Sequence, residues 1–224
     1  MTNIILSSFQ VSKGIKSIGP KGLLPVNSHT KKPLIIQQIE NIKSIFGKKK
    51  HKIHVVVGYQ KEKVIKTLDK YSFSKTLNII KYRSYETYGQ AKPIAELICS
   101  FEKSNVLIIN EGVLFTNLNI PKKTSIYTLP KNKHNFEIGA VITNNTVNYL
   151  CYDIPNIWAE ITFIQKNDLF NIQDITQNKI QNKINPVFMF EYINYLIDNQ
   201  VTFQTKLLRY NSIKHIKTVK GLYK

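Results

Sequence analysis

Basic residues near the N-terminus follow an apolar segment at a spacing that suits phosphate binding. Residues 3–9 are largely apolar, and the loop after them carries Lys13 and then the pair Pro20-Lys21, before an amphipathic segment begins at Pro33. A parallel strand, a loop and a helix in this order bring backbone N–H groups and cationic side chains to one point. This arrangement is how a chain forms an anion site at the carboxyl end of its first strand; the alternative, which we slightly favour, is that Lys13 and Lys21 are simply two of the thirty lysines.

Other residues that could do chemistry show no recognisable arrangement. The five histidines have no metal-ligand spacing with one another or with Cys99 and Cys151, and no Gly-x-Ser-x-Gly motif marks a nucleophile. The two cysteines lie far apart in segments that we expect in the core, which is typical of reduced, buried thiols in an intracellular protein. The sequence predicts neither a catalytic nucleophile nor a metal site.

The net charge of +18 is concentrated at the two ends of the chain. Residues 1–75 carry +12 (15 Lys against three acidic residues), residues 76–198 are neutral, and residues 199–224 carry +6. Such a field favours nucleic acid or another polyanion as a partner. The alternative is compositional bias, as from an AT-rich genome such as that of many viruses. Arg83 and Arg209 are the only arginines, whereas readers of phosphates and bases usually use arginine.

Strand and helix patterns alternate through the first half of the chain. Short apolar or β-branched runs predict strands, and apolar residues three or four apart predict amphipathic helices. The predicted strands are 3–9, 53–57, 77–82 and 106–109, and the predicted helices are 34–46, 62–71 and 90–101. This alternation is typical of an α/β fold with a parallel sheet and right-handed crossovers.

After Pro121 the pattern changes to short strands joined by Asn-rich turns. We expect strands at 125–129, 138–143, 147–152 and 157–163, a short helix at 167–175, a polar loop at 177–185, an apolar helix at 187–199 and a strand-like segment at 201–210. The basic tail, 211–224, is expected to become ordered only on a partner. We expect two domains, 1–165 (α/β) and 166–224 (a helical and strand extension with the basic tail), packed together.

Hydrophobic runs place limits on where the protein acts. No apolar run approaches the ~20 residues of a membrane span. The first ten residues are too short, and lack the basic start, for a signal peptide. We therefore expect an intracellular, cytoplasmic protein with no membrane partner.

Motifs spread in order along residues 3–165 resemble those of the sugar-phosphate and choline-phosphate nucleotidyltransferases. The resemblance is carried by PKGLLPVNSHTKKPLIIQQIENI (20–42), VVVGY (55–59), VLIINEGVLF (106–115) and WAEIT (158–162). It implies a Rossmann-like, GT-A-like fold: a mixed, mostly parallel sheet flanked by helices, with a smaller β-rich region. It also implies an enzyme that joins an NTP to a phosphorylated small molecule and releases pyrophosphate.

The resemblance also assigns nucleotide-site positions to this chain. The phosphate loop and the lysine that follows it correspond to Ser7, Phe9, Val11, Lys13 and Lys21. The base-contacting turn corresponds to Gly89 and Gln90. The two metal-binding carboxylate positions of the family correspond to Gly112 and Thr162, and Glu160 is a glutamate near the second of them.

The phosphate loop departs from the family pattern. Phe9 and Val11 replace its two glycines. Glycine lets the backbone turn sharply and lie against phosphates, so we expect Phe9 to block the triphosphate pocket.

The metal-binding positions depart as well. Gly112 and Thr162 replace both aspartates, which removes the carboxylates that would anchor Mg²⁺. Glu111 and Glu160 lie one and two residues away. A two-residue step keeps a side chain on the same face of a strand, so Glu160 is the better substitute.

These departures predict a catalytically degenerate pseudoenzyme. Such a chain would serve, without a cofactor, as a structural, assembly or binding module, for example in a virion, with protein partners or as a homo-oligomer. One alternative is an active nucleotidyltransferase with a remodelled metal site that uses Mg²⁺ with an NTP. The other is a nucleic-acid-binding protein that uses its basic termini.

Overall fold

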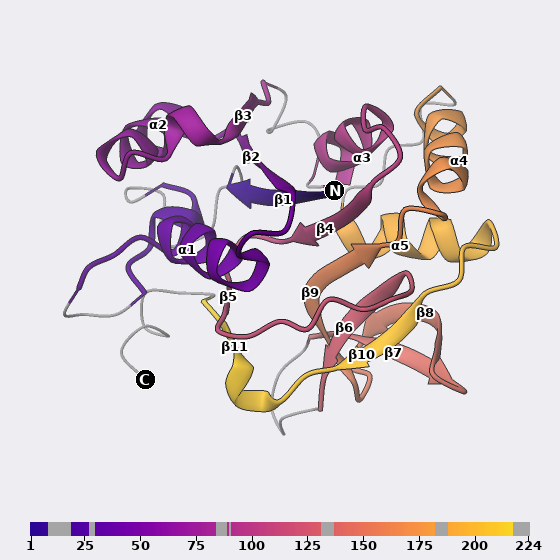
Figure 1. Ribbon diagram of the computed structural model, residues 1–224. Helices are drawn as coiled ribbons and strands as arrows, with labels where there is room; N and C mark the ends of the chain where they lie inside the picture. The colour runs from indigo at the N-terminus through magenta and orange to yellow at the C-terminus, as the bar shows by residue number, and fades with distance from the viewer. Residues whose placement is uncertain are drawn as a thin grey trace. The chain divides into compact units, whose positions relative to one another are not determined.

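The computed structural model describes residues 1–8, 19–26, 30–83, 89, 91–130, 137–181 and 188–216 (Figure 1). The chain divides into two compact units. The first comprises Met1–Thr87, Ile109–Leu118 and Ser212–Lys224, and the second comprises Tyr88–Ile108 and Asn119–Asn211. The predicted domain boundary after residue 165 stays a prediction.

The first unit contains a parallel sheet in the order β3-β2-β1. Every residue of β1 is buried, as expected for a parallel strand covered on both faces. The strands predicted at 3–9, 53–57 and 77–82 are confirmed, apart from Phe9, which lies outside the described residues. Their bounds are β1 (Thr2–Ser8), β2 (His51–Val57) and β3 (Asn78–Lys81).

Helices α1 and α2 belong to the same unit and each buries one apolar stripe, as predicted. α1 follows Pro33 and ends at Gly47, whose φ of +50° lies in a region that glycine reaches easily. The bounds are α1 (Leu34–Phe46) and α2 (Lys61–Lys70), with the 3-10 turns η1 (Lys21–Leu23) and η2 (Ser74–Thr76).

A small antiparallel sheet in the first unit joins segments from distant parts of the sequence, β5 (Val113–Phe115) and β11 (Ile213–His215) (Figure 1). α1 supports it, because Gln38 Nε2 donates to the carbonyl oxygen of Val113 at 2.7 Å. The prediction that the tail is ordered only on a partner is therefore wrong for residues 211–216. Residues 217–224 lie outside the described part of the chain.

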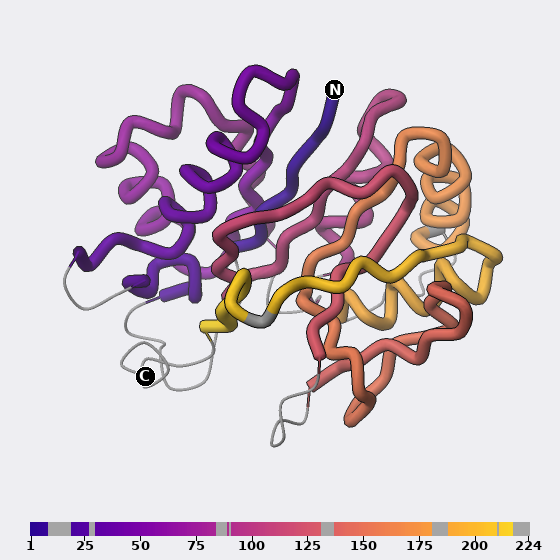
Figure 2. The backbone as a smooth tube through the Cα atoms, turned by 60° about the horizontal axis from the view of Figure 1, so that its bottom comes forward, coloured from indigo at the N-terminus to yellow at the C-terminus, as the bar shows by residue number. Residues whose placement is uncertain are grey.

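The second unit is β-rich, and Figure 2 traces its backbone. Its strands run in the order β9-β6-β10-β8-β7. β7 also pairs with β9 through Gly139 and Ile157, so these strands close on themselves. β6 and β10 are parallel, whereas the other pairs are antiparallel. The bounds are β4 (Asn105–Ile109), β6 (Ser125–Leu129), β7 (Ile138–Thr143), β8 (Thr146–Tyr152), β9 (Ile157–Ile164) and β10 (Gln204–Leu207).

Helices of the second unit are joined to their neighbours by side-chain amides. Gln173 Nε2 donates to the carbonyl oxygens of Ile98 (2.9 Å) and Phe101 (2.7 Å), which ties α4 to the end of α3. Asn194 of α5 accepts from the backbone N–H of Leu150 and donates to its carbonyl oxygen, which docks α5 on β8. The bounds are α3 (Ala91–Cys99), α4 (Leu169–Gln181), α5 (Met189–Asp198) and the 3-10 turn η3 (Tyr210–Ser212).

α4 is longer than its sequence predicts. The polar loop expected at 177–185 is wrong for residues 177–181, which continue the helix. Ile172, Thr176 and Lys179 are all buried and lie three or four residues apart, so one face of α4 stays covered through this stretch.

The predicted fold class is confirmed. The chain is an α/β protein in which parallel strands and helices occupy the first unit and a mixed β-rich sheet with helices occupies the second. Within the described residues, no helix has the length and apolar character needed to cross a bilayer.

Candidate functional site

The carboxyl end of β1 carries two serine hydroxyls with unusual surroundings. Ser7 and Ser8 are 2 % and 0 % exposed, and their Oγ atoms have no hydrogen-bond partner among the described residues. A buried hydroxyl without a partner costs about 1–3 kcal/mol. Such groups need a partner, which a ligand, a water molecule or an ion can supply.

The turn η1 lies directly against Ser8. A Cβ on Gly22 would be 2.4 Å from Ser8 Oγ, so this residue has to be glycine for η1 to approach β1 so closely. The backbone N–H of Gly22 donates to Glu111 Oε1 at 3.1 Å, and Glu111 is 3 % exposed. Glu111 therefore fixes the backbone next to Lys21 with a charge-assisted hydrogen bond.

The surroundings of Gly112 account for a glycine at one of the two positions where the family has a metal-binding aspartate. Its φ is +96°, and a Cβ there would lie 3.1 Å from the carbonyl oxygen of Ile216 and 3.2 Å from Lys21 Cδ. An aspartate at this position would require both neighbours to move and would be strained in its backbone. The same construction puts Lys21 Nζ 3.9 Å from the Cβ position, so the ammonium group lies beside Gly112.

The C-terminal strand β11 helps to shape this cluster. The backbone N–H of Ile216 donates to the carbonyl oxygen of Gly112 at 2.7 Å. Ile216 is fully buried with Leu24, which follows η1, and with Leu34, which begins α1. Residues from the two ends of the sequence therefore hold η1 and Gly112 together.

Glu160 lies in a β-bulge of β9, in the second unit. Ile126 pairs with Thr162 and Thr128 pairs with Trp158, so residues 159–161 face one residue of β6. Glu160 has φ of +58°, which is rare for a non-glycine residue. The expectation that Glu160 can substitute for a carboxylate at position 162 assumes that side chains alternate regularly between the two faces of the strand. That alternation does not hold across this bulge. Bulges occur preferentially at sheet edges and beside active sites, where they redirect a side chain.

Thr162 resembles the two serines in its environment. It is 2 % exposed, and its Oγ1 has no hydrogen-bond partner among the described residues. The second unit thus has a buried, unpaired hydroxyl at a position where the family resemblance places a metal ligand.

The predicted site residues fall into three groups. One group, Ser7, Lys21 and Gly112, belongs to the first unit, where Lys21 lies beside Gly112, and a second, Glu160 and Thr162, belongs to the second unit. Gly89 is half-buried and outside the helices and strands. The remaining positions, Phe9, Val11, Lys13 and Gln90, lie outside the described residues, so the expected block by Phe9 stays a prediction.

The sequence interpretation missed some contributors to the first-unit cluster. Ser8 and Gly22 adjoin predicted positions, and the Pro-Lys-Gly sequence was the available signal for Gly22. Nothing in the sequence pointed to Ile216, because its partner Gly112 is over 100 residues away.

Oxygen donors in the first unit suit a hard cation bound together with phosphates. No group of three His, Cys, Asp or Glu side chains within the described part of the chain could hold a metal ion alone. Mg²⁺ that binds with a nucleotide usually needs one or two carboxylates and takes its other ligands from phosphates and water. Glu111, with one oxygen bonded to Gly22, fits such a partial donor set.

Solved structures match this fold over almost the whole chain. The CTP:phosphocholine cytidylyltransferase of Streptococcus pneumoniae matches with a TM-score of 0.80 at 18 % identity, covering 99 % of this chain and 96 % of the other. A nucleoside-diphosphate-sugar pyrophosphorylase from Vibrio cholerae matches with 0.73 at 12 % identity, covering 100 % and 98 %. The inositol-1-phosphate CTP transferase of T. maritima matches with 0.69 at 10 % identity, covering 100 % and 95 %. No protein-family model and no curated protein matches the sequence.

These matches overturn the functional prediction made from the motif departures. The hypothesis of a catalytically degenerate structural, assembly or virion module is wrong, because the matched structures are transferases and pyrophosphorylases and nothing indicates a structural or virion role. The alternative of an active enzyme fits them better. The expected protein and nucleic-acid partners stay predictions.

The matches are below 20 % identity, so they concern architecture. Within that limit they agree with the motifs along residues 3–165. The chain has the fold of the nucleotidyltransferases, as its sequence motifs indicate.

Proposed function

We propose that the protein is a nucleotidyltransferase that joins an NTP to a phosphorylated small molecule and releases pyrophosphate. The observation that carries the proposal is the cluster at the end of β1. There, the buried, unpaired hydroxyl of Ser8 adjoins Gly22 of η1, and Ser7, with a second such hydroxyl, precedes it in β1, in the same unit as the Lys21 ammonium group. Hydroxyl donors and a lysine at the carboxyl end of a parallel strand are suited to a phosphate chain.

Each member of the cluster has a distinct role in this proposal. The Lys21 ammonium group neutralises phosphate charge, and the serine hydroxyls donate hydrogen bonds to phosphate oxygens. Glu111 acts as a positioning residue, because its carboxylate holds the backbone of Gly22 beside Lys21.

The reaction is an exchange of one phosphoanhydride bond for another. A phosphate oxygen of the acceptor attacks the α-phosphorus of the NTP, the bond to the β-phosphate breaks, and pyrophosphate leaves. Mg²⁺ bound with the nucleotide would stabilise the charge that develops on the leaving group. Glu111, in the first unit, is the carboxylate that we propose as its protein ligand.

CTP and phosphocholine are the first substrates to test. They are the substrates named for the matched S. pneumoniae enzyme, whose TM-score is 0.80, and the WAEIT segment of this chain resembles the choline-type enzymes. Sugar phosphates and inositol phosphate are the further acceptors that the other matches suggest.

The direct test is pyrophosphate release with Mg²⁺, for each of the four NTPs paired with phosphocholine, glucose 1-phosphate or inositol 1-phosphate. We expect turnover with at least one pair and a loss of about 10²–10³-fold in Lys21→Ala, the usual cost of removing one charge-stabilising donor. Lys75→Ala, at an exposed lysine of the same unit, is the matched control and should keep full activity.

A binding measurement separates a missing acceptor from a missing nucleotide site. An NTP that binds only the folded protein raises the melting temperature Tm. We expect such a shift with Mg²⁺ present and a smaller one in Glu111→Gln. No shift with any NTP at millimolar concentration, together with no turnover, would contradict the proposal.

A further inference from the structure

Three aromatic side chains stack against one another on the surface of the second unit, and we call them the aromatic patch. Tyr152, the last residue of β8, lies edge-on to Phe190 of α5, with ring centroids 5.7 Å apart. Phe188, just before α5, stacks on Phe190 at 5.9 Å. Tyr152 is 59 % exposed and Phe188 is 46 % exposed, so the rings on both sides of Phe190 remain largely in water.

Hydrogen bonds fix the backbone beneath the aromatic patch. Glu191 Oε2 accepts from the backbone N–H of Phe188 at 3.0 Å, which holds the residue before α5. Asn194 bonds the N–H and the carbonyl oxygen of Leu150 on β8, at 2.7 and 2.8 Å. Phe190 and Asn194 are four residues apart and so lie on one side of α5, which directs Phe190 toward β8. The rings are therefore positioned before a partner binds, which lowers the entropic cost of a contact.

The distribution of charge makes this surface suitable for a contact between two copies of the chain. Two copies with a net charge of +18 each repel one another, most strongly where the lysines are dense. The patch belongs to residues 76–198, whose net charge is zero. Asp153 and Glu191 directly follow Tyr152 and Phe190 in the sequence, so negative charge offsets the positive field here. Two copies can meet at this surface with comparatively little repulsion.

Aromatic rings favour a partner that brings rings of its own. Edge-to-face and offset-stacked ring pairs are favourable beyond the area that they bury. In a twofold contact the same surface of each copy faces the other, so the patch would meet a second patch. The second copy thus supplies the chemistry that the exposed rings lack.

The exposed area of the rings sets the expected strength of such a contact. An aromatic side chain buries 150–250 Å² in all, so the exposed fractions of Tyr152 and Phe188 leave about 100 Å² on each ring. A standard stable interface buries about 800 Å² per partner. The two rings can form the centre of such a contact but supply only a part of its area, so the dimer should be weak.

We propose that the aromatic patch is the centre of a weak, reversible homodimer contact, in which the patches of two copies of the chain face each other across a twofold axis. The patch shares no residue with the nucleotide-site cluster of the first unit. The proposal therefore does not depend on the proposed function.

Sedimentation velocity of the full chain at rising protein concentration tests the proposal. We expect dimer at protein concentrations of about 100 μM, as for a small interface. The dimer fraction should rise with salt, because salt screens the repulsion between like-charged copies and leaves the apolar contact in place. The double variant Tyr152→Ser/Phe188→Ser should weaken the dimer about tenfold. Tyr152→Lys alone adds repulsion at the more exposed ring and should weaken it as well.

Matched controls separate this surface from other apolar groups. Phe170→Ser removes a ring that is 81 % exposed on α4, in the same unit, and should leave the dimer unchanged. Tm measured for each variant shows that it remains folded. Equal weakening in Phe170→Ser, or none in the double variant and in Tyr152→Lys, would overturn the proposal.

Two further outcomes would also contradict it. A chain that stays monomeric at every concentration and salt would leave the patch to a different partner. A dimer fraction that falls as salt rises would show that paired charges, and not the rings, hold the two copies together.

Discussion

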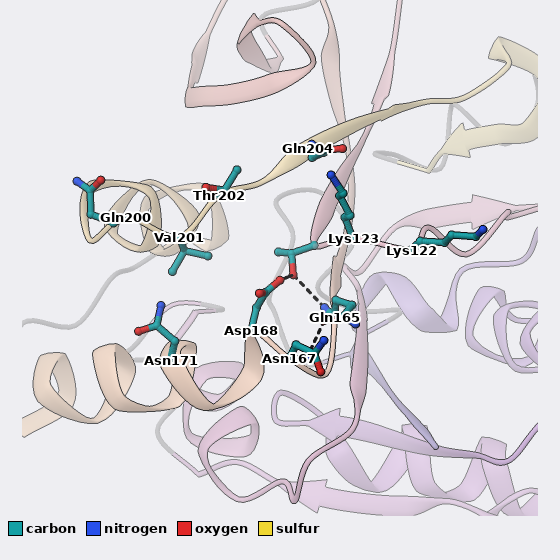
Figure 3. A pocket seen from close by; sticks show the side chains of 11 residues that line it. Lys122, Lys123, Gln165, Asn167, Asp168, Asn171, Gln200, Val201, Thr202 and Gln204 are labelled. Carbon is teal, nitrogen blue, oxygen red and sulfur yellow. Dashed lines mark hydrogen bonds between the residues drawn. The ribbon is translucent and has the colours of Figure 1, made fainter.

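The nucleotide-site cluster of the first unit and a polar cavity of the second unit are built in opposite ways. In the cluster, Gly22 lies against the Ser8 side chain and Gly112 against the Ile216 carbonyl oxygen and the Lys21 side chain, so a Cβ has no space at Gly22 and little at Gly112. The cavity is about 500 Å³ and is lined by long polar side chains on three loops, with Thr124 as their common partner. These loops contain residues 122–124, 165–171 and 200–204 (Figure 3). Substitutions in the cluster should therefore lower the free energy of unfolding more than substitutions at the rim of the cavity.

Removal of β11 should give the largest effect on the first unit. A chain ending at Asn211 loses the pairing with β5 and the buried Ile216 of the Leu24–Leu34 cluster. We expect the free energy of unfolding to fall by about 3 kcal/mol or more, and Tm by about 6–12 °C.

A chain ending at Ile216 is the control for this deletion. It removes residues 217–224, which lie outside the described residues, and should keep the stability of the full chain. Thermal unfolding of both truncated chains makes the comparison. Equal Tm values would show that β11 does not stabilise the cluster. The predicted role of the basic tail is tested by measuring nucleic-acid binding of both truncated chains against the full chain. If the tail binds nucleic acid, its loss reduces the dependence of the binding constant on salt concentration.

Protonation of His54 should destabilise the parallel sheet of the first unit. His54 is 3 % exposed on β2, with Nε2 3.0 Å from Asn3 Oδ1 and Nδ1 2.9 Å from Asn78 Nδ2. Burial, and then the charge of Lys52, lowers the pKa of His54 to about 4 from 6.5. Between these values the unfolded chain binds more protons than the folded one, so stability falls as the pH falls from about 6.5 to 4.

The predicted loss from His54 is about 3 kcal/mol over this interval, from 1.36 kcal/mol per pKa unit. Urea unfolding at pH 7, 5.5 and 4.5 measures it. His54→Gln lacks the titration, so its stability should depend less on pH by that amount. The same pH dependence in both proteins would show that other groups are responsible.

Gly112→Ala and Gly47→Ala separate crowding from backbone strain. Both glycines have positive φ, but Gly47 has no atom within 4 Å of a Cβ position, whereas Gly112 has the Ile216 carbonyl and Lys21 against it. We expect a loss of about 2 kcal/mol or more at Gly112 and about 1 kcal/mol at Gly47. Chemical unfolding of the two variants gives the difference, and equal losses would mean that the cluster has room to adjust.

The same contrast accounts for what the sequence could predict. Buried strands and amphipathic helices such as β1 and α1 follow from local patterns, so they are found with boundaries close to those observed. β5 and β11 are three residues each and depend on partners about 100 residues apart, so no local pattern reveals them. The bulge at Glu160 and the meeting of three loops at Thr124 are likewise properties of the packed chain.

The functional misprediction has a related cause. Loss of catalysis was inferred from the residue types at positions 9, 11, 112 and 162, without knowledge of their surroundings in the fold. Gly112 is a glycine because Lys21 and Ile216 occupy the space beside it. Replacement of a motif residue therefore shows that a site has changed, and the surrounding contacts are needed to judge whether its function is lost.

Thr124→Val and Thr202→Val test the contrast within the cavity itself. Valine keeps the volume of threonine but removes the hydroxyl. At Thr124 the change leaves the N–H of Gln165 and the carboxylate of Asp168 without their partner, for an expected loss of about 1–2 kcal/mol in the free energy of unfolding. Thr202 is exposed on the rim, so the same change should stay within about 0.5 kcal/mol. If both variants unfold at the same denaturant concentration as the unaltered chain, Thr124 does not hold the three loops together and the cavity has no fixed wall.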